Sequence, residues 1–312
     1  MQLSIIIVNY NLSQEIRKCI HSILDQVNPD NATDFEIVVI DNNSPDRSIE
    51  TLSDEFPTNY SNHVQFYFLN ENKGFGTGNN YGARKSKGEF LLFLNPDTQF
   101  SENTLKNLFE LISKHVSFDI IGLQIIKPDG TPEISLGQFP TILSEALGIL
   151  NFSLLLKKRD YFKKVKESSN NLIEVDWVTG SALVVSRNSF NSVMGFDEKF
   201  FMYNEEVDLC KRIKNVGGKI YFYKDAIIIH AGSLSSKKNY YFFTKTSYES
   251  KLYYLKKHFK GINLYMLLFL FLLQVISQLV FWMFMLPIEK QKALSKIKGF
   301  LEVLNSFVMK KV

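Results

Sequence analysis

The sequence predicts an α/β protein whose sheet is mostly parallel, Rossmann-like and flanked by helices. Through the first hundred residues, short apolar runs of strand length alternate with amphipathic stretches of helix length. Strands separated by such helices form right-handed βαβ units. The apolar runs are nearly continuous, which is typical of strands that are buried on both faces. Polar clusters follow three of these runs directly.

The elements can be placed in order along this region. The expected strands are Leu3–Val8, Glu36–Ile40, Val64–Leu69 and Phe90–Leu94, and the expected helices are Leu12–Gln26, Ser48–Phe56 and Gly76–Ser86. In the first helix, Ile16, Ile20 and Ile23 share one face. Ligands of such sheets bind outside the carboxyl ends of the strands. This rule selects three polar clusters, at residues 9–10, 41–43 and 95–97.

The chain is less regular after residue 100. Residues 142–156 form an apolar patch and residues 157–166 a basic run, which we interpret as a variable insertion with a solvated charged face. Regular structure is expected to resume at Val175–Val185, in a helix over Glu205–Asn215, and in strand-like runs at Lys219–Tyr223 and Ala226–His230.

The segment 262–288 lies between Lys260 and Glu289 and holds no charged residue. About 20 apolar residues suffice for a helix to cross a bilayer. We therefore favour a membrane segment over a core or oligomer helix, and a re-entrant hairpin stays open. Lysines flank both sides, so the charge rule does not fix an orientation. Beyond it, apolar residues recur at helical spacing between lysines, as in an amphipathic helix on an anionic surface.

Composition excludes several classes of protein. A chain of 312 residues forms one large or two small domains. Its two cysteines, Cys19 and Cys210, exclude a disulfide scaffold and a four-cysteine zinc site, and they agree with a reducing compartment. A net charge of +4 is too weak to indicate nucleic-acid binding. The apolar run at the N-terminus is too short for a secretory signal.

Several motifs carry chemistry. Gly74, Gly76 and Gly78 form a Gly-rich turn that can cradle phosphate, but their spacing is not that of the dinucleotide fingerprint, and no Walker motif occurs. This disfavours a dehydrogenase and a P-loop NTPase. Asp97, at the end of a strand, can hold a divalent cation or simply form a turn. His230 ends an apolar strand, where it can ligate metal, contact phosphate or be structural.

Three carboxylates begin one predicted helix: Glu205, Glu206 and Asp208. A helix N-terminus favours acids, which is a sufficient structural reason for them. Crowded carboxylates also raise at least one pKa, which suits a general base. Glu205 and Asp208 share a face, while Glu206 points elsewhere.

Taken together, these blocks resemble the family 2 glycosyltransferases, and above all rhamnosyltransferase-like members of bacterial surface polysaccharide synthesis. The likeness runs from Ser4 to about Ser235. It is carried by SIIIVNYN at 4–11, DNNS at 41–44, NKGFGTGNN at 72–80, LNPD at 94–97, WVTGS at 177–181, GFDEKFFMYNEEVDLCKR at 195–212 and HAGSLS at 230–235. Each motif is weak alone, and seven in register are specific.

The resemblance implies a GT-A fold and inverting transfer of a sugar from a nucleoside-diphosphate sugar. It favours dTDP-L-rhamnose, with UDP-hexoses as the alternative donors, and a divalent cation, Mn²⁺ or Mg²⁺. The implied acceptor is a glycan or a polyprenyl-diphosphate-linked saccharide of O-antigen or capsule synthesis. The protein would then act at the cytoplasmic face of the bacterial inner membrane. The oligomeric state stays open.

The resemblance also implies a division of the chain and roles for its residues. The divisions are a catalytic domain over 1–240 (nucleotide-binding half about 1–100, acceptor half about 101–240), a basic connecting helix over 241–260, the membrane segment over 261–288 and an amphipathic basic tail over 289–312. The residues that would bind nucleotide are Asn9, Tyr10, Asp41, Asn43, Lys73 and Gly74.

The remaining roles concern metal, sugar and catalysis. The implied metal ligands are Asp97 and His230, while Asn95 replaces the first acid of the usual D-x-D. Glu206 matches the catalytic base, and Glu205 is the other candidate. The residues that would shape the sugar pocket or orient the acids are Asn95, Trp177, Gly180, Asp208 and Arg212.

Two rival functions belong to other classes. A nucleotidyltransferase would need a basic Gly-rich loop after the first strand, and residues 9–13 lack both glycine and lysine. A non-catalytic, membrane-tethered binding module would not need Asp97, Glu206 and His230 together. A sugar-transfer assay separates that module from the enzyme.

Overall fold

The computed structural model describes residues 1–27, 34–46, 48–52, 55–56, 63–114, 117–149, 165, 167–232 and 239–309. The basic run expected at 157–166 lies almost wholly outside the described residues, and Ser233–Ser235 of the last motif lies outside them too. Contacts divide the chain into two compact units. The sheet unit comprises Met1–Gln138, Lys163–Lys199 and Glu205–Gly232, and the helical unit comprises Phe139–Phe162, Phe200–Asn204 and Ser233–Val312.

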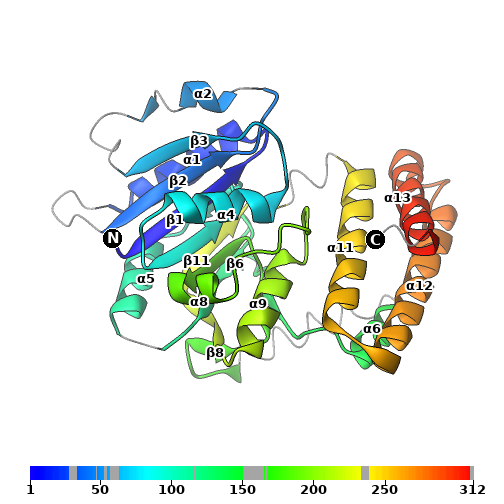
Figure 1. Cartoon of the computed structure of the whole chain (residues 1–312). Helices are drawn as coiled ribbons and strands as arrows, with labels where there is room; N and C mark the ends of the chain where they lie inside the picture. Colours follow the sequence, from blue (N-terminus) through cyan, green and yellow to red (C-terminus); the bar gives the residue numbers. More distant parts are fainter. Residues whose placement is uncertain are drawn as a thin grey trace. The chain divides into compact units, whose positions relative to one another are not determined.

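The sheet unit is built on one large mixed sheet (Figure 1). Its described strands, in spatial order, are β3 (Val64–Phe68), β2 (Phe35–Asp41), β1 (Leu3–Asn9), β4 (Phe90–Leu94), β10 (Ala182–Ser186), β6 (Ile120–Ile126), β11 (Ile220–His230) and β5 (Thr98–Phe100), with β8 (Leu172–Glu174) on β11. A separate pair joins β7 (Leu136–Gly137) to β9 (Trp177–Val178).

Strand direction decides which ends meet. β3, β2, β1 and β4 are parallel to one another, and β10 is antiparallel to both β4 and β6. β11 is parallel to β6. The carboxyl ends of β1, β2, β4, β6 and β11 therefore share one edge of the sheet with the start of β10. The expectation of a mostly parallel sheet is confirmed.

Most expected elements appear within one or two residues of their predicted bounds. Val175–Val185 is two strands, β9 and β10, because residues 179–181 turn between them. The two runs from Lys219 to His230 are one strand, β11, with a register shift between Tyr223 and Ile227. β5, β6 and α5 (Thr104–Ser113) fall in a region for which no elements were expected.

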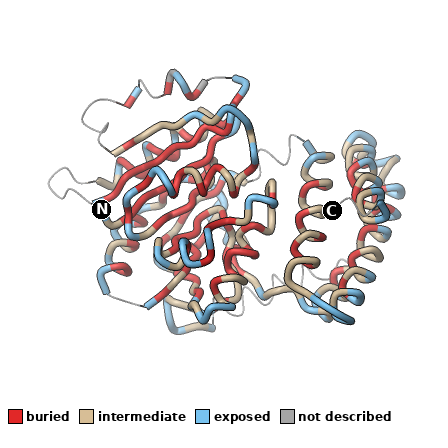
Figure 2. The backbone as a smooth tube through the Cα atoms, viewed as in Figure 1, coloured by how far each residue is buried: buried red, intermediate tan, exposed pale blue. Residues whose placement is uncertain are grey.

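Both faces of the sheet are covered by helices, and its strands are almost continuously buried (Figure 2). One face carries α1 (Ser13–Leu24) and α5, whose apolar residues join Ile5 and Ile7 in one core cluster. The other face carries α4 (Phe75–Lys85), which crosses the front of β1 in Figure 1. The remaining helices of this unit are α2 (Ser48–Leu52), α8 (Arg187–Ser192) and α9 (Glu205–Asn215).

The glycines of α4 allow that helix to lie against β1. A Cβ on Gly82 would lie 2.4 Å from Cγ2 of Ile6, and one on Gly78 would lie 2.9 Å from Cγ1 of Val8. These distances are shorter than side chains tolerate. Gly78, one of the three glycines that suggested a phosphate cradle, thus has a packing cause.

The helical unit contains α6 (Ile142–Ile149), α11 (Tyr240–His258), α12 (Gly261–Phe284) and α13 (Lys290–Val308). α12 buries one stripe, formed by Leu267, Phe271, Val275, Leu279 and Trp282. The ring of Phe271 contacts Tyr248 of α11 and Phe307 of α13, with centroids 6.0 and 6.1 Å apart. Within this unit α12 thus packs against both neighbouring helices.

α12 is the described helix that is long and apolar enough to cross a membrane by length and composition. Its most apolar 18-residue window has a mean hydropathy of 2.3, yet only 17% of that window is buried. A core helix of a soluble protein would be mostly buried. The interpretation of 262–288 as a core helix of this unit is therefore not supported.

Candidate active site

The polar clusters that follow β1, β2 and β4 lie at one edge of the sheet. Asn9 pairs in register with Asp41, and Ile7 pairs with Leu94, the residue before Asn95. Because these strands are parallel and adjacent, their carboxyl ends are neighbours. The expected convergence of these clusters is observed.

Asp41 is fixed by a network at the end of β2. Its Oδ1 accepts hydrogen bonds from Asn9 Nδ2 at 2.7 Å and Ser44 Oγ at 2.6 Å, and its Oδ2 accepts one from the Ser44 amide at 2.9 Å. Asn9 is wholly buried and Asp41 is 5% exposed. The carboxylate is thus an immobilised acceptor. Nearby Tyr10 is 45% exposed, and Asn43 is exposed with a φ of 59°.

The loop before α4 is held from β2. Asn42 Nδ2 donates to Asn72 Oδ1 at 2.8 Å and to the Gly74 carbonyl at 3.1 Å. Gly74 has a φ of 94°, a conformation that favours glycine, at the start of α4. Lys73 is exposed and pairs with Glu71 at 2.6 Å, and this hydrogen bond raises the pKa of Lys73. Asn42 and Asn72 belong to motifs that the sequence analysis quoted, but it assigned them no role in holding this loop.

Asp97 and His230 face each other at this edge. Nε2 of His230 lies 3.2 Å from Oδ1 of Asp97, and both side chains are less than a tenth exposed. The other ring nitrogen, Nδ1, lies 3.1 Å from Oε2 of Glu133. Burial alone would lower the pKa of His230, but hydrogen bonds to Asp97 and Glu133 outweigh it and raise the pKa to about 9.

The donor set bears on metal binding. No cluster of three or more metal-ligating side chains occurs among the described residues. One carboxylate and one imidazole suit a divalent cation that takes its remaining ligands from water and from a bound ligand's oxygens. Asp97 and His230 therefore fit a shared ion rather than an all-protein cage. Glu133, in the loop after β6, was missed because it lies 97 residues from His230.

Asn95 does not stand free at this edge. Its backbone amide donates to the Ser181 carbonyl at 3.0 Å, and its Nδ2 donates to Ser181 Oγ at 3.2 Å. These bonds tie the end of β4 to the start of β10. Asn95 thus connects the edge where Asp97 lies to the strand that follows Gly180.

The first turn of α9 separates its three acids by burial. Glu205 is 5% exposed, Asp208 is wholly buried, and Glu206 is half-buried. Burial, and then the charge of Glu206, raises the pKa of Glu205 well above its ordinary value. Oε2 of Glu205 accepts no hydrogen bond from the described residues. The three acids therefore differ in burial, and Glu206 is the most exposed of them.

Asp208 is held by Arg212. Nε of Arg212 donates to Asp208 Oδ2 at 2.7 Å, and Nη1 donates to the Val193 carbonyl at 2.6 Å. The guanidinium thus anchors α9 to the loop after α8. The side chain of Arg212 bonds Asp208 directly, as expected of a supporting residue.

Glu206 lies beside Gly180, close to the sheet edge. A Cβ on Gly180 would lie 3.5 Å from both Glu206 Cβ and Phe75 Cε1. Glu206 is therefore a neighbour of the turn before β10 and of the start of α4. Trp177, three residues earlier, donates from Nε1 to the Gln138 carbonyl at 2.8 Å, and its ring lies over Gly137.

The backbone just before α9 is strained. Tyr203 and Asn204 have φ values of 71° and 66°. Non-glycine residues in this region cost on the order of 1–3 kcal/mol each and cluster at functional sites. The strain lies directly before Glu205 and Glu206.

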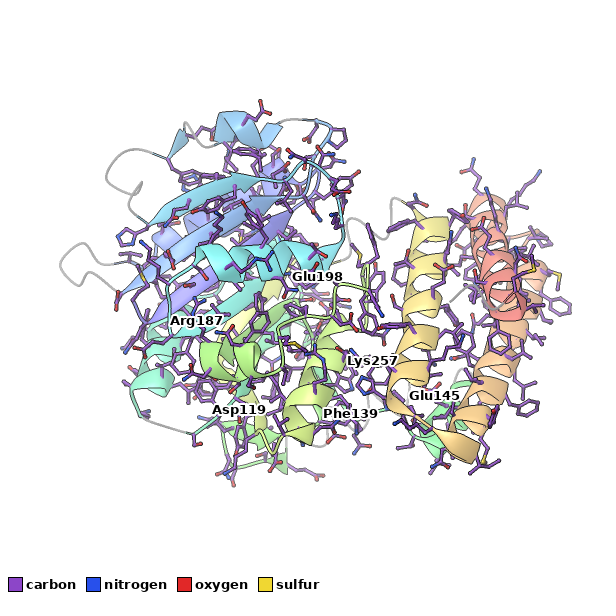
Figure 3. The ribbon with its side chains drawn as sticks, in the orientation of Figure 1. Asp119, Phe139, Glu145, Arg187, Glu198 and Lys257 are labelled. Atoms are coloured by element: carbon purple, nitrogen blue, oxygen red, sulfur yellow. The ribbon has the colours of Figure 1, made fainter. Side chains whose placement is uncertain are left out.

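A cavity of about 570 Å³ lies elsewhere, between the later part of α4 and the residues around α8. Figure 3 labels two residues of its lining, Arg187 and Glu198. Arg187 donates to the carbonyls of Gly88 and Ala83 at 2.6 and 2.8 Å, and Asn80 donates to Glu198 at 3.0 Å. We place the site at the sheet edge instead, because the polar clusters that the sequence selects converge there.

The mixed sheet, with helices on both faces and polar clusters at one carboxyl edge, agrees with the GT-A fold that the motifs imply. Residues 4–178 match the family model described as Glycosyl transferase family 2, which covers more than half of the chain. The chain therefore belongs to family 2 of the glycosyltransferases, which confirms the resemblance of its motifs.

Three relatives are sugar transferases by their names. A low-salt glycan biosynthesis hexosyltransferase of Haloferax volcanii is 28% identical over 221 residues, 68% of this chain and 61% of the relative. Rhamnosyltransferase WbbL of Escherichia coli is 31% identical over 180 residues, which are 55% of this chain and 65% of the relative. The N-acetylglucosaminyl-diphospho-decaprenol L-rhamnosyltransferase of Mycobacterium tuberculosis is 26% identical, over 62% and 66%. The chain thus spans just under two thirds of these relatives.

Solved structures agree on the fold. A Pyrobaculum calidifontis mannosyltransferase in complex with GDP-Man and Mn²⁺ has a TM-score of 0.61 at 12% identity, covering all of this chain and 88% of its own. GalNAc-T7 with UDP, GalNAc and Mn²⁺ has a TM-score of 0.58 at 18% identity, covering 73% and 43%. At such identities the likeness shows the fold alone.

Proposed function

We propose that this family 2 enzyme is an inverting rhamnosyltransferase that uses dTDP-L-rhamnose. The observation that carries the proposal is the position of Glu206. It lies beside Gly180, next to the start of β10, at the sheet edge where Asp41, Asp97 and His230 also lie. The names of two relatives support rhamnose as the sugar.

Each residue has a role in the proposed reaction. Asp41 accepts a hydrogen bond from the nucleotide base, while Asn9, Tyr10, Asn43, Lys73 and Gly74 line the nucleotide. Glu206 accepts the proton of the acceptor hydroxyl, whose oxygen attacks the anomeric carbon opposite the diphosphate. Glu205 is the second candidate for the base. Trp177, Gly180 and Asn95 shape the sugar pocket, and Asp208 with Arg212 fixes α9.

Asp97 and His230 would hold a divalent cation, Mn²⁺ or Mg²⁺. Such an ion offsets the negative charge of the diphosphate leaving group. Glu133 keeps the imidazole oriented with Nε2 toward Asp97.

We propose a lipid-linked or polysaccharide acceptor of surface glycan synthesis, such as O-antigen or capsule. Residues 1–240 would then form the catalytic part and residues 241–312 the membrane-associated part. The cytoplasmic face of a bacterial inner membrane is the site of action that agrees with a nucleotide-sugar donor. The apolar helix α12 supports this location.

A UDP-hexose donor is the second candidate. The name of the Haloferax volcanii relative specifies only a hexosyltransferase, which leaves hexoses other than rhamnose as candidates. The two donors differ in nucleotide and in sugar, so nucleotide binding separates them first.

The first test is thermal stabilisation of the full chain by dTDP, UDP, GDP and NAD, each with and without Mn²⁺. Ligand at 100 times its dissociation constant adds about 2.7 kcal/mol of stability. We expect Mn²⁺-dependent stabilisation by dTDP, followed by transfer of rhamnose to a polyprenyl-diphosphate saccharide. Stabilisation by UDP alone would support the UDP-hexose enzyme. Stabilisation without transfer from any donor would indicate a non-catalytic binding module.

A further inference from the structure

The exposed face of α12 forms an unbroken apolar stripe. Its members recur at helical spacing along the whole helix: Ile262, Tyr265, Met266, Phe269, Ile276, Val280, Met283 and Phe284. Each of them is at least 42% exposed. We call these residues the α12 stripe. They lie on the face opposite the buried stripe that runs from Leu267 to Trp282.

The buried face of α12 rests on charged helices along its length. Near the middle, Gln274 accepts a hydrogen bond from Lys251 of α11 at 2.8 Å, and the same ammonium pairs with Glu145 of α6, labelled in Figure 3. Near the end, the ring of Trp282 lies 4.8 Å from the ammonium of Lys296 of α13. Within this unit, α12 therefore lies in direct contact with charged side chains of α11 and α13.

These neighbours argue against a crossing of the bilayer. If α12 spanned the hydrocarbon, then α11 and α13 would enter it beside α12. They carry Lys245, Lys251 and Glu302, among other charges, within their lengths. Charges near the bilayer centre are strongly unfavourable on insertion scales. A helix lying in the plane of the interface avoids this cost.

Charge identifies the surface that the stripe meets. Residues 239–309 hold nine lysines and three glutamates, while the whole chain has a net charge of only +4. Exposed Lys260 and Lys290 stand at the two ends of α12. α13 also exposes Leu294, Leu301 and Val308. An apolar stripe with lysines at its ends matches an anionic lipid surface.

We propose that the helical unit is a monotopic membrane anchor in which α12 lies in the plane of an anionic bilayer surface, with the α12 stripe inserted. This inference rests on the proposed action at a membrane and specifies how the protein binds it. Residues 262–288 would then neither cross the membrane, nor re-enter it as a hairpin, nor serve as a core or oligomer helix.

Insertion depth tests the arrangement directly. Single cysteines that replace Ile262, Phe269, Ile276 or Phe284 in the full chain are spin-labelled one at a time. The wild-type protein, treated with the same label, measures any labelling of Cys19 and Cys210, which are buried. With vesicles of phosphatidylglycerol and phosphatidylethanolamine, we expect equal, shallow depths at all four positions. A spanning helix, about 36 Å long at 1.5 Å per residue, would place the two middle labels deep and the end labels near opposite surfaces. That depth profile would overturn the proposal.

Charge substitution tests the stripe itself. Phe269→Glu or Ile276→Glu should weaken flotation with these vesicles roughly tenfold, equivalent to about 1.4 kcal/mol. Val216→Glu is the matched control, because Val216 is 69% exposed but lies in the sheet unit. Unchanged flotation of the stripe variants would overturn the proposal. The proposal would also be overturned if the wild-type protein formed a dimer, did not bind vesicles, and dissociated into monomers after either substitution. The α12 stripe would then contact a second copy of the chain.

Nucleotide binding keeps the two proposals distinguishable. Stabilisation by nucleotide and Mn²⁺ should be the same in the stripe variants as in wild type, because the stripe belongs to the helical unit. Loss of flotation with intact nucleotide stabilisation therefore supports the anchor. Normal flotation without any nucleotide response would contradict the proposed function and leave the anchor standing.

Discussion

At the scale of single residues, the two adjacent acids of α9 are divided by burial. Glu205 is nearly enclosed, whereas Glu206 is half-buried beside Gly180. A base must reach the acceptor hydroxyl, so accessibility favours Glu206.

Exchanging the acids one at a time tests this assignment. Glu206→Gln should lower kcat by about 10²–10⁴-fold, the usual contribution of general base catalysis, while donor binding persists. The measurement is transfer kinetics together with nucleotide-induced stabilisation. Glu205→Gln should retain most activity. A reversed ranking would assign the base to Glu205.

Glu133 orients His230 and can be tested without activity. Glu133→Gln keeps a hydrogen-bonding side chain but removes the charge facing Nδ1 of His230. Loss of such a partner typically costs 10–100-fold in metal affinity. We expect this loss in Mn²⁺ binding measured by electron paramagnetic resonance in the presence of nucleotide. Asp129→Asn, on an exposed turn of the same loop, is the control. Equal affinity in both variants would refute the orienting role.

The raised pKa of His230 predicts how stability depends on pH. The pKa rises from 6.5 to about 9 on folding, so the imidazolium stabilises the metal-free protein fully below pH 6.5. This contribution, at most about 3 kcal/mol, is lost as the pH rises through about 9. Urea unfolding at pH 6 and pH 9 measures the loss, which should vanish in His230→Asn. An equal loss in that variant would assign it to other groups.

At the scale of elements, the position of α4 depends on glycines. The first turn of α4 begins at the sheet edge because Gly78 and Gly82 let the helix approach β1. These two glycines therefore affect the site indirectly, because they set how closely α4 packs against β1.

Adding one methyl group tests this close approach. Gly82→Ala places a Cβ 2.4 Å from Ile6, and overpacking of this kind costs about 1–3 kcal/mol. Urea unfolding measures the change. Gly148→Ala is the control, because Gly148 also lies inside a helix but its Cβ would be 3.4 Å from Gln274 Nε2, an ordinary van der Waals contact. If Gly82→Ala is as stable as wild type, the glycine is not required for packing.

At the scale of the whole molecule, positive charge is concentrated in the C-terminal helices. Binding to anionic vesicles should therefore weaken as salt rises, because the Debye length shortens from about 10 Å at 0.1 M to 3 Å at 1 M. Flotation at increasing salt measures this. Residual binding at high salt would reflect the α12 stripe, whose apolar contacts salt does not screen. Binding that is independent of salt would argue against the role of the lysines.

The sequence by itself determined the parallel half of the sheet and the identity of the site motifs. Apolar runs such as Leu3–Val8 are local signals, and polar residues directly after them mark the carboxyl edge. It also determined the family, since seven short motifs in order are legible without a structure. β6 was missed because the interpretation followed the regular alternation of the first hundred residues, which stops before this strand.

Only the tertiary structure decided which distant residues meet. Glu133 joins His230 across 97 residues, and Asn42 holds the loop at Gly74, although no local pattern marks either contact. The same holds for α12. Its composition alone allows a span, but the charged helices packed on one of its faces favour a position in the plane of the membrane. Local sequence determines that a segment such as α12 is helical and apolar. The helices that folding packs against it determine whether its apolar surface crosses the membrane or lies in its plane.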